Sequence, residues 1–411
     1  MKRKLSLLGG TTTAGDCRAA VGYLLRPRRL VTGPAIDAYE QAFARAVGVR
    51  HACSFASGRV GLYAILRALG IGPGADVLLQ VPTHIVVPNA IRHAGARPAY
   101  VDCVSHNWNI DLEHAARQVT PHTRALVLQH TFGIPADMDA VLNFADEHGL
   151  VLIEDCVHAL GATWRGRPVG SFGRAAFFST EETKMISTTM GGMVVTDDEA
   201  LNERIRTYQR TCSWPSPGLT RRYLVKLLAY HVLTEPHVHR VARAGYEALG
   251  EAQPLPQPTS AQELRGGWLP ELEQRLSNAQ SAIGLRQLRR LDANLDHRRA
   301  IADRYARLIT DRGFAIATFP QEATPSWVRF PLTVPDRSAA VRATHPHVVL
   351  GTWFTSVLEE ARTPGDGAYA DGSCPKAEDA ARHLVNLPTH GRVTEDDAVT
   401  LVAALPSVPQ C

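Results

Sequence analysis

Short apolar segments alternate with amphipathic segments along the first half of the chain, and this alternation limits the fold more than any other feature. Val, Leu and Ile dominate segments such as 75–81 (ADVLLQV) and 150–156 (LVLIEDC), which are typical of buried strands. Residues 33–48 and 138–148 place apolar side chains at helical spacing. The alternation predicts an α/β fold, with a mostly parallel sheet covered by helices on both faces. In such sheets, functional side chains gather at the carboxyl ends of the strands.

The second half has a different texture, which predicts a second domain. With 411 residues, the chain is too long for one core of ordinary size. We expect a large α/β domain over residues 1–250 and a smaller α+β domain over residues 251–411. Pro-rich stretches (SWPSPG and QPLPQPTS) flank a helical piece, so we interpret residues 212–270 as an irregular insertion. The remaining expected elements are a long helix over 277–310, strands at 326–334 and 348–354, and a last helix over 395–405.

Composition and charge argue against several classes of partner. The net charge of +4 comes from 44 basic and 40 acidic residues mixed along the chain, so we expect no nucleic-acid binding. No segment approaches the roughly 18 apolar residues of a spanning helix, so we expect no membrane contact. The 17 histidines include no HExxH pattern, so we expect no metal site. The seven cysteines form no CxxC pair, which favours reduced thiols and a cytoplasmic location.

Two polar motifs at predicted strand ends each have a structural and a functional interpretation. Ser57, Gly58 and Arg59 form a turn before a helix, where backbone N–H groups can face a phosphate, although most such turns are only turns. Asp155 ends an apolar strand. Its carboxylate either caps a helix or forms a salt bridge, or it pairs with a protonated ring nitrogen of a bound cofactor.

A third motif places a lysine after a strand end. Lys184 follows Ser179 and precedes a Gly-Gly pair that leads into the next strand. A single lysine is usually a solvated surface residue, whereas a desolvated lysine can lose its proton and form an imine with an aldehyde. Its position after Ser179, a hydroxyl that could bind phosphate, and after Asp155 favours the functional interpretation.

From about Leu30 to Leu405, the sequence resembles the DegT/DnrJ/EryC1/StrS family of fold-type-I pyridoxal-phosphate enzymes, mostly sugar aminotransferases. Matching segments include GPAIDAYEQAFARAVG, GIGPGADVLLQVPTHIVVPNAI, IEDCVHALGATWRGRPVGSFG and LSNAQSAIGLRQLRRLD. The resemblance implies a transaminase with pyridoxal 5'-phosphate as its cofactor. It also implies a homodimer, because the sites of this family are built at a dimer interface.

The resemblance assigns three residues to the reacting part of the cofactor. Lys184 would carry the cofactor as a Schiff base and move a proton between the substrate carbon and the cofactor. Asp155 would pair with the pyridine nitrogen. His158 would face the ring on the side of the phenolic oxygen.

Four further residues are assigned to holding the cofactor. Ser179 and the backbone of Gly58 and Arg59 would bind the phosphate, and His84 would stack over the pyridine. The sequence departs from the family pattern at Arg59, where relatives carry Thr, so the backbone donors remain but the hydroxyl does not. His84 stands where relatives usually carry a larger aromatic ring.

A further departure concerns the neighbouring subunit. Relatives often supply an Asn to the phosphate two residues before the Arg of an Arg-x-Ser-like stretch. Here Arg275 begins that stretch but Glu273 occupies the Asn position. We therefore expect another neighbour residue, Arg275 or Asn278, to supply the contact.

The resemblance implies a ping-pong amino transfer. An amino acid, with glutamate as the first choice, would give its nitrogen to a keto sugar or cyclitol in nucleotide-sugar, antibiotic or other secondary-metabolite biosynthesis. One alternative is an enzyme of the same fold that acts on a non-sugar substrate. Another is a dehydratase, although that branch replaces the Schiff-base lysine with His and Lys184 argues against it. A third is a non-catalytic regulator, which the joint presence of Lys184, Asp155 and Ser179 argues against.

Overall fold

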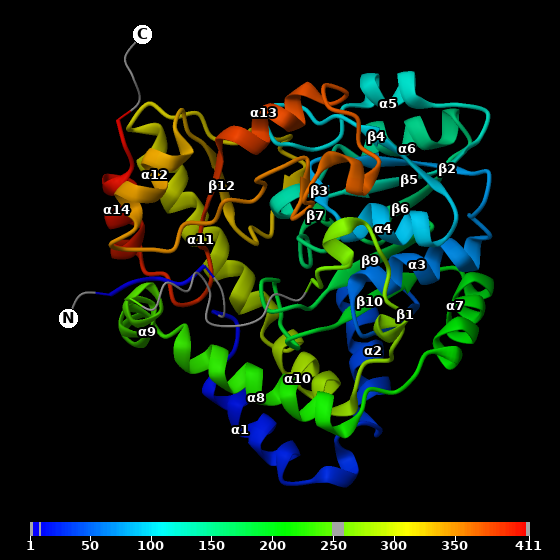
Figure 1. Cartoon of the computed structure of the whole chain (residues 1–411), viewed down its shortest axis with the longest axis horizontal. Helices are drawn as coiled ribbons and strands as arrows, with labels where there is room; N and C mark the ends of the chain where they lie inside the picture. Colours follow the sequence, from blue (N-terminus) through cyan, green and yellow to red (C-terminus); the bar gives the residue numbers. More distant parts are fainter. Residues whose placement is uncertain (1–2, 8–9, 249–258, 408–411) are drawn as a thin grey trace.

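The computed structural model describes residues 3–7, 10–248 and 259–407. Its central sheet is built from β1 (His51–Phe55), β2 (Asp76–Gln80), β4 (Arg97–Val101), β5 (Thr123–Gln129), β6 (Val151–Asp155), β9 (Ala175–Ser179) and β10 (Gly192–Thr196). The strands lie in the order β1-β10-β9-β6-β5-β2-β4 (Figure 1). Neighbours from β9 to β4 are parallel, whereas β10 is antiparallel to both β1 and β9. The prediction of a mostly parallel sheet is therefore confirmed.

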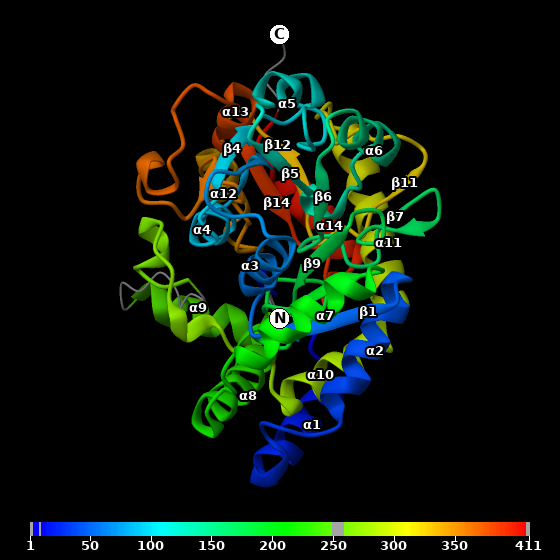
Figure 2. The same cartoon turned by 90° about the vertical axis from the view of Figure 1, so that its right-hand side faces the viewer.

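Helices cover both faces of this sheet, which explains why its strands are apolar along their whole length. In β2, Val77 and Leu79 belong to one buried cluster and Leu78, between them, to another. Because side chains alternate across a strand, these clusters lie on opposite faces. On one face pack α3 (Gly58–Leu69), α4 (Val86–His93) and α7 (Glu199–Thr211), and on the other α5 (Leu112–Gln118) and α6 (Met138–Glu147) (Figure 2).

Two helices of the first half end at glycines, as the sequence indicates. The predicted helix over 33–48 is α2 (Ala35–Val47), and it ends at Gly48, whose φ of 77° is a left-handed conformation that glycine adopts without strain. Gly70 ends α3 in the same way, with a φ of 71°. The strand–turn–helix order of β1 and α3 therefore places the Ser57–Arg59 turn at the edge where β6 and β9 also end.

A separate apolar cluster lies in the C-terminal part. It brings together the antiparallel strands β12 (Phe330–Thr333) and β14 (Leu384–Leu387) with α11 (Leu291–Thr310), α12 (Arg337–Thr344) and α14 (Glu395–Ala404). Leu5 from the N-terminal segment joins the same cluster. The predicted last helix is confirmed as α14. The division of the chain at residue 250 stays a prediction.

The predicted single helix over 277–310 is wrong. The structure has two helices, α10 (Asn278–Leu288) and α11, separated at Arg289 and Arg290. Arg290 has a φ of −117° and a ψ of 13°, which are outside the helical range. α10 packs against α2, whereas most of α11 packs in the C-terminal cluster. The break lets one apolar sequence pattern serve two packing surfaces.

The predicted strand over 348–354 is also wrong. This segment forms only isolated bridges, between Leu5 and Val348 and between Gly351 and Asn386. Several of its residues line a pocket, so its apolar character reflects a pocket wall rather than a sheet. Just after it, β13 (Leu358–Glu359) pairs in parallel with β3 (Thr83–His84).

Residues 212–270 are more helical than predicted. Two helices, α8 (Pro217–Leu233) and α9 (Pro236–Ala248), replace the single helical piece, and most of the second Pro-rich stretch lies outside the described residues. Leu224 and Leu227 of α8 are buried with Ala20 of α1 (Ala14–Leu24) and Ile283 of α10. α8 is therefore a packed part of the fold.

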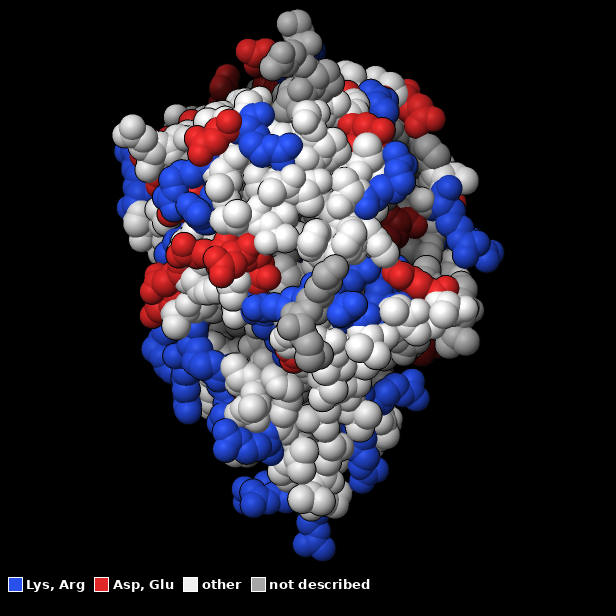
Figure 3. Space-filling view, turned by 90° about the vertical axis from the view of Figure 1, so that its left-hand side faces the viewer, with Lys and Arg blue, Asp and Glu red and all other residues white. Residues whose placement is uncertain are grey.

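One face of the molecule shows basic side chains alone in its lower part and both signs of charge above it (Figure 3). On the face in Figure 3, basic side chains lie in several separate groups, and acidic side chains stand among them in its upper part. In the part of the chain that the structure describes, no helix has the length and apolar character needed to cross a membrane.

Candidate active site

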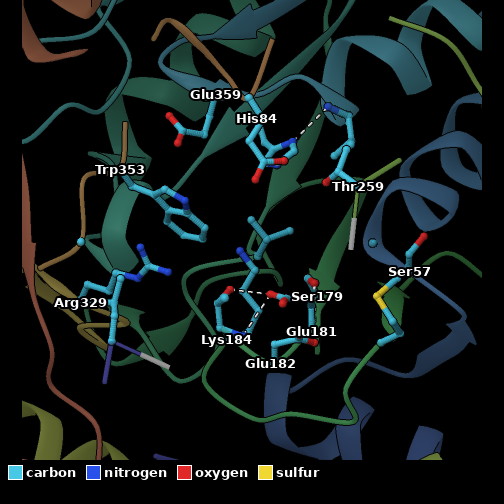
Figure 4. Close-up of a pocket in the computed structure, with 18 of the residues that line it drawn as sticks. Ser57, His84, Ser179, Glu181, Glu182, Lys184, Thr259, Arg329, Trp353 and Glu359 are labelled. Carbon is cyan, nitrogen blue, oxygen red and sulfur yellow. Dashed lines mark hydrogen bonds and ion pairs between the residues drawn. The ribbon is translucent and has the colours of Figure 1, made fainter. Parts of the chain in front are cut away.

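A pocket of about 490 Å³ opens at the carboxyl edge of the central sheet (Figure 4). Its lining includes five of the predicted site residues, namely Gly58, Arg59, His84, Ser179 and Lys184. A smaller pocket of about 40 Å³ shares His84 and Lys184 and is also lined by the other two, Asp155 and His158. The structure therefore brings all seven predicted residues together, as expected from strands that end at one edge.

The turn before α3 has the form of an anion site. Ser57 precedes the helix without capping it, and its buried Oγ has no hydrogen-bond partner. A Cβ on Gly58 would lie 3.1 Å from the carbonyl oxygen of Phe178, and one on Gly192 would lie 2.3 Å from the carbonyl group of Ser57. The two glycines let the turn press directly against β9 and β10. The first backbone N–H groups of α3 thereby stay available at the pocket, where the helix dipole favours an anion.

The Arg59 side chain is bound elsewhere. Its guanidinium forms a buried ion pair with the Glu263 carboxylate, which is itself placed by the N–H of Ser260. The side chain is thus tied to the segment that follows α9. Only the backbone of Arg59 is left to face the turn, and its role in holding a phosphate stays a prediction.

Lys184 lies in the loop after β9 and points into the pocket. Its Nζ lies 4.5 Å from the centroid of the Trp353 ring, and it has no hydrogen bond or ion pair with any described residue. Burial, opposed by Glu181 and reinforced by Arg329, lowers the pKa of the Lys184 ammonium to about 8. An amine with this pKa is partly uncharged near neutral pH and can act as a nucleophile or a base.

Asp155 ends β6 with an unsatisfied carboxylate. Oδ1 accepts a hydrogen bond of 3.1 Å from the N–H of Val157, but the buried Oδ2 has no partner. Burial raises the pKa of Asp155 to about 7, against the opposing influence of the Val157 N–H and the charge of Lys184. A cation placed at Oδ2 would restore the charged form.

His158 lies beside Asp155 as a neutral ring. It stacks on Trp353, with centroids 5.1 Å apart, and on Phe132, with centroids 6.2 Å apart. Burial, with the nearby charges of Lys184 and Arg329, holds the pKa of His158 well below its ordinary value. Its Nδ1 is buried and has no partner, so a hydrogen bond of this ring to a bound molecule is unmet.

His84 and Ser179 complete the predicted set. The N–H of Val86 donates to Nδ1 of His84 at 3.3 Å, and Nε2 lies 3.1 Å from a carboxylate oxygen of Glu360. These partners place the proton of an uncharged ring on Nε2. Ser179 ends β9 at the pocket, and its Oγ accepts a hydrogen bond of 3.4 Å from the N–H of Glu181.

Comparison with known proteins identifies the family of this site. The model of the DegT/DnrJ/EryC1/StrS aminotransferase family matches residues 13–242 and 250–406, nearly the whole chain. This chain belongs to that family. It is therefore an enzyme of the aminotransferase type, and the resemblance noted from the sequence is confirmed.

Individual relatives agree along almost their full length. The spore coat polysaccharide biosynthesis protein SpsC of Bacillus subtilis is 29% identical over 390 residues, which cover 92% of this chain and 90% of SpsC. GDP-perosamine synthase of Caulobacter vibrioides is 29% identical over 382 residues, with the same coverage of 92% and 90%. The structure of DesV from S. venezuelae, in complex with a ketimine intermediate, is 27% identical with a TM-score of 0.74, covering 95% of this chain and 93% of DesV.

Several pocket residues of this aminotransferase were not singled out from the sequence. Trp353 and Arg329 lie beside Lys184, and Thr259, Glu359 and Glu360 line the same pocket. Arg329 did carry a signal, since it is a lone charge within the apolar segment SWVRFPLTV. The others sit in segments without a repeating pattern, and only the fold brings them to the pocket.

The two residues expected to contact a neighbouring subunit are engaged within their own chain. Asn278 accepts a hydrogen bond from the N–H of Ala35 and donates one to the carbonyl of Arg29. Arg275 donates to the carbonyls of Gln209, Cys212 and Arg210. Both are poor candidates for a phosphate contact across an interface, because binding there would cost these hydrogen bonds.

One group of potential metal ligands occurs among the described residues, formed by buried His130, Glu154 and Cys156. Glu154 accepts hydrogen bonds from the N–H groups of Gly170, Phe172 and Gly173 and contacts the His130 ring. The protein's own donors thus occupy the carboxylate oxygens of Glu154. Two H-x-H pairs also exist, at 237–239 and 345–347, outside that group.

Proposed function

We propose that this protein is a pyridoxal-phosphate-dependent aminotransferase that moves an amino group from an amino acid to the keto group of a sugar or cyclitol. Glutamate is the first-choice donor, and the pathway would be nucleotide-sugar or secondary-metabolite biosynthesis. The observation that carries the proposal is the unpaired Oδ2 of Asp155. It lines the same small pocket as Lys184, which adjoins the larger pocket that holds the turn at the start of α3.

The residues present fit the cofactor at three points. The buried Ser57 Oγ, the Ser179 hydroxyl and the first N–H groups of α3 suit a phosphate. The orphaned Asp155 carboxylate suits a protonated ring nitrogen, and the free Nδ1 of His158 suits a hydrogen bond to the ring's substituents. When bound, the cofactor would supply an aldehyde carbon for the donor nitrogen and an electron sink for the carbon that loses a proton.

The chain's own groups then divide the work. Lys184, with its pKa lowered to about 8, holds or releases a proton at Nζ near neutral pH. The Asp155 carboxylate would pair with the protonated ring nitrogen of the cofactor. Neutral His158 would form a hydrogen bond to a substituent of the same ring without adding charge to the site. Trp353 and Phe132 wall the site beside His158 and exclude water there.

A sugar acceptor is supported by the relatives and by the extent of the pocket. SpsC is a polysaccharide biosynthesis protein, and GDP-perosamine synthase makes a sugar nucleotide by its name. The larger pocket continues past Lys184 to Tyr230 and Leu233 of α8 and His239 of α9. These helices belong to the segment 212–270, so we propose that this segment shapes the acceptor end.

The decisive test is covalent trapping at Lys184. The purified protein should be yellow, and borohydride reduction should attach the cofactor to one of the five lysines, Lys184. Glutamate should convert the bound cofactor to its amine form and discharge the colour. Lys184→Ala should abolish turnover, whereas Lys376→Ala, which removes an exposed lysine paired with Asp111, should not.

The same experiment separates the alternatives. Trapping without conversion by any amino donor would favour a different reaction on the same cofactor, and no cofactor binding would favour a non-catalytic homologue. Full turnover in Lys184→Ala would end the aminotransferase proposal.

We also propose that the enzyme is a homodimer and that it works in the cytoplasm. Valines at 225, 232 and 241, on α8 and α9, are more than half exposed and could be covered in an assembly. The six cysteines within the described residues are free thiols. Light scattering at working concentration should show a dimer or a larger even oligomer, and an active monomer would contradict the first of these proposals.

A further inference from the structure

A tight turn carries Lys184 into the pocket. Residues 181–184 form this turn, which is closed by a hydrogen bond of 3.1 Å from the N–H of Lys184 to the carbonyl of Glu181. The carboxylate of Glu181 braces the turn, because it accepts hydrogen bonds from the N–H and the hydroxyl of Thr183. Glu182 stands at the corner of the turn, and Figure 4 shows it close to Glu181 and Lys184. A restraint on Glu182 therefore acts on the placement of Lys184.

A buried ion pair fixes the corner of this turn to α8. Nζ of Lys226 lies 2.6 Å from Oε1 of Glu182, and the two side chains are 16% and 5% exposed. Oε2 of Glu182 is buried and has no hydrogen-bond partner among the described residues. Burial and the charge of Glu181 raise the pKa of Glu182 to about 8, against the opposing charge of Lys226. Without Lys226, this carboxylate would be buried with little compensation.

A second contact joins α8 to the same loop on the other side of the lysine. The hydroxyl of Thr189 donates to the carbonyl of Tyr223 in α8 at 3.1 Å. Thr189 has a φ of 72°, in the left-handed region that a β-branched residue rarely adopts. Such a backbone conformation persists only where the surrounding structure holds it. α8 therefore contacts the loop on both sides of Lys184.

α8 is suited to this task because it is both packed and part of the pocket wall. Leu224 and Leu227 are buried against α1 and α10, so the helix has a firm support. Tyr230 and Leu233 line the pocket, and Lys226 stands about one helical turn before Tyr230. The same helix thus supports the turn that carries Lys184 and the wall beside it.

We propose that Glu182 and Lys226 are a positioning pair, which holds the turn so that Lys184 reaches its working place in the pocket. The assignment rests on the proposed aminotransfer, because it concerns the residue that would move the proton. The pair acts through the backbone of the turn, and neither side chain has to touch a substrate. It gives the segment 212–270 a part in the placement of Lys184, in addition to its proposed part in shaping the acceptor end.

The test removes the pair from the side of α8. Lys226→Met keeps an apolar stem of similar length and removes the charge. In the half-reaction of the cofactor-loaded enzyme with glutamate, its maximal rate should fall by about 30-fold, because a displacement of about 1 Å can cost on the order of 100-fold. The glutamate concentration for half-maximal rate should stay within a few-fold of wild type, since no substrate contact is removed.

Two further variants keep the test independent of a single substitution. Lys226→Arg keeps the charge and should restore most of the rate. Glu182→Gln breaks the same pair from the side of the turn, and its rate should fall as that of Lys226→Met does. It carries the test if Lys226→Met does not fold.

A second readout does not depend on turnover. Protein without cofactor is mixed with pyridoxal 5'-phosphate and reduced with borohydride after short intervals, and the labelled peptides are quantified by mass spectrometry. In the wild type the label should collect at Lys184. In Lys226→Met it should form at Lys184 about 10-fold more slowly, because the amine spends less time in the reactive position.

Arg206→Met is the matched control. Arg206 forms an ion pair of the same 2.6 Å with buried Glu40, whose side chain is 4% exposed, and neither residue lines the pocket. Both substitutions should lower the melting temperature, but only Lys226→Met should slow Lys184.

Three outcomes would contradict the assignment. Normal rates per folded molecule in Lys226→Met would make the pair a structural contact, like that of Arg206. A loss confined to the half-reaction with the keto acceptor would show that the pair serves the acceptor end alone. A wild type that takes no label at Lys184 and reacts with no amino donor would overturn the proposed function, and the assignment with it.

Discussion

Glu154 and Asp155 are adjacent carboxylates at the end of β6, and they have opposite surroundings. Both are buried, at 0% and 1% exposure. Being consecutive in a strand, their side chains point to opposite faces of the sheet. Glu154 accepts three backbone hydrogen bonds of 2.7 Å and contacts the His130 ring, which in turn accepts from the N–H of Ala136. Asp155 has one hydrogen bond and an orphaned oxygen.

This difference teaches which of two buried acids is structural. A carboxylate whose lone pairs are all used by the protein stabilises the fold and has nothing left to offer a ligand. A buried carboxylate with an unused oxygen costs stability, which a bound cation can recover. By this criterion Glu154 and His130 are closed, meaning that the protein uses all their hydrogen-bonding atoms. Asp155 and His158 are open, because each keeps one buried atom without a partner.

The largest expected effect concerns Asp155. Asp155→Ala should lower turnover by about 10³-fold, roughly 4 kcal/mol, because the ring nitrogen of the cofactor loses the charge that keeps it protonated. Asp155→Asn should still bind cofactor but turn over poorly. Steady-state rates at saturating cofactor measure this, and a variant within a few-fold of wild type would make Asp155 another structural acid.

The second prediction uses the pH dependence of stability to test whether Asp155 is an open acid, with an unpaired buried oxygen. With its pKa raised from 3.8 to about 7, Asp155 keeps a proton in the folded protein that the unfolded chain releases. In the protein without cofactor, its contribution to stability is therefore complete below about pH 4 and lost as the pH rises to about 7.

The free energy of unfolding of the wild type, relative to Asp155→Asn, should fall over that window by up to about 4 kcal/mol. Chemical denaturation at several pH values tests it. Cofactor should flatten the dependence, because a cation beside Asp155 lowers its pKa. If this difference in unfolding free energy does not change with pH in the protein without cofactor, Asp155 is not an open acid.

The third prediction concerns the closed acid. Glu154→Gln replaces one carboxylate oxygen with an NH2 group, which cannot accept a hydrogen bond. At least one of the buried donors that now bond to Glu154 would lose its acceptor, so the change should cost about 3 kcal/mol of stability. Turnover per folded molecule should stay within a few-fold of wild type. Thermal melting and activity on the same samples would check both. A stable but inactive Glu154→Gln would place Glu154 in the active site and break the comparison.

The smallest effect is expected at His84, which is fully hydrogen-bonded like a structural residue but is placed like a site residue. Its ring nitrogens are satisfied, as those of His130 are, yet it lines the pocket. If it stacks over the cofactor, His84→Ala should weaken cofactor binding by about 1 kcal/mol and His84→Phe should keep or tighten it. Cofactor dissociation constants of both variants decide this. Tight binding by Ala together with disruption by Phe would leave His84 a purely structural residue.

The family, and the meeting of the proposed site residues at one edge of the sheet, could be predicted from the sequence because they depend on local order. Apolar strands that alternate with helices make a parallel sheet, and such a sheet places the residues after its strands at one edge. Asp155 and Ser179 end strands and Lys184 follows one, so their meeting at the adjoining pockets was predictable. The Gly-Gly pair was also visible, and the structure shows that Gly192 makes room for the Ser57 turn.

What the sequence by itself determined is therefore the sheet, its flanking helices and the chemical types at the strand ends, since periodicity records which faces are buried. Only the tertiary structure decided which polar atoms are paired. The pairing of Arg59 with Glu263, the orphaned oxygen of Asp155 and the stacking of Arg329 on Trp353 join segments far apart in the chain. The break between α10 and α11 has the same origin, because one helical pattern faces two different cores. Hydrogen-bond satisfaction depends on distant neighbours, and no local pattern encodes them.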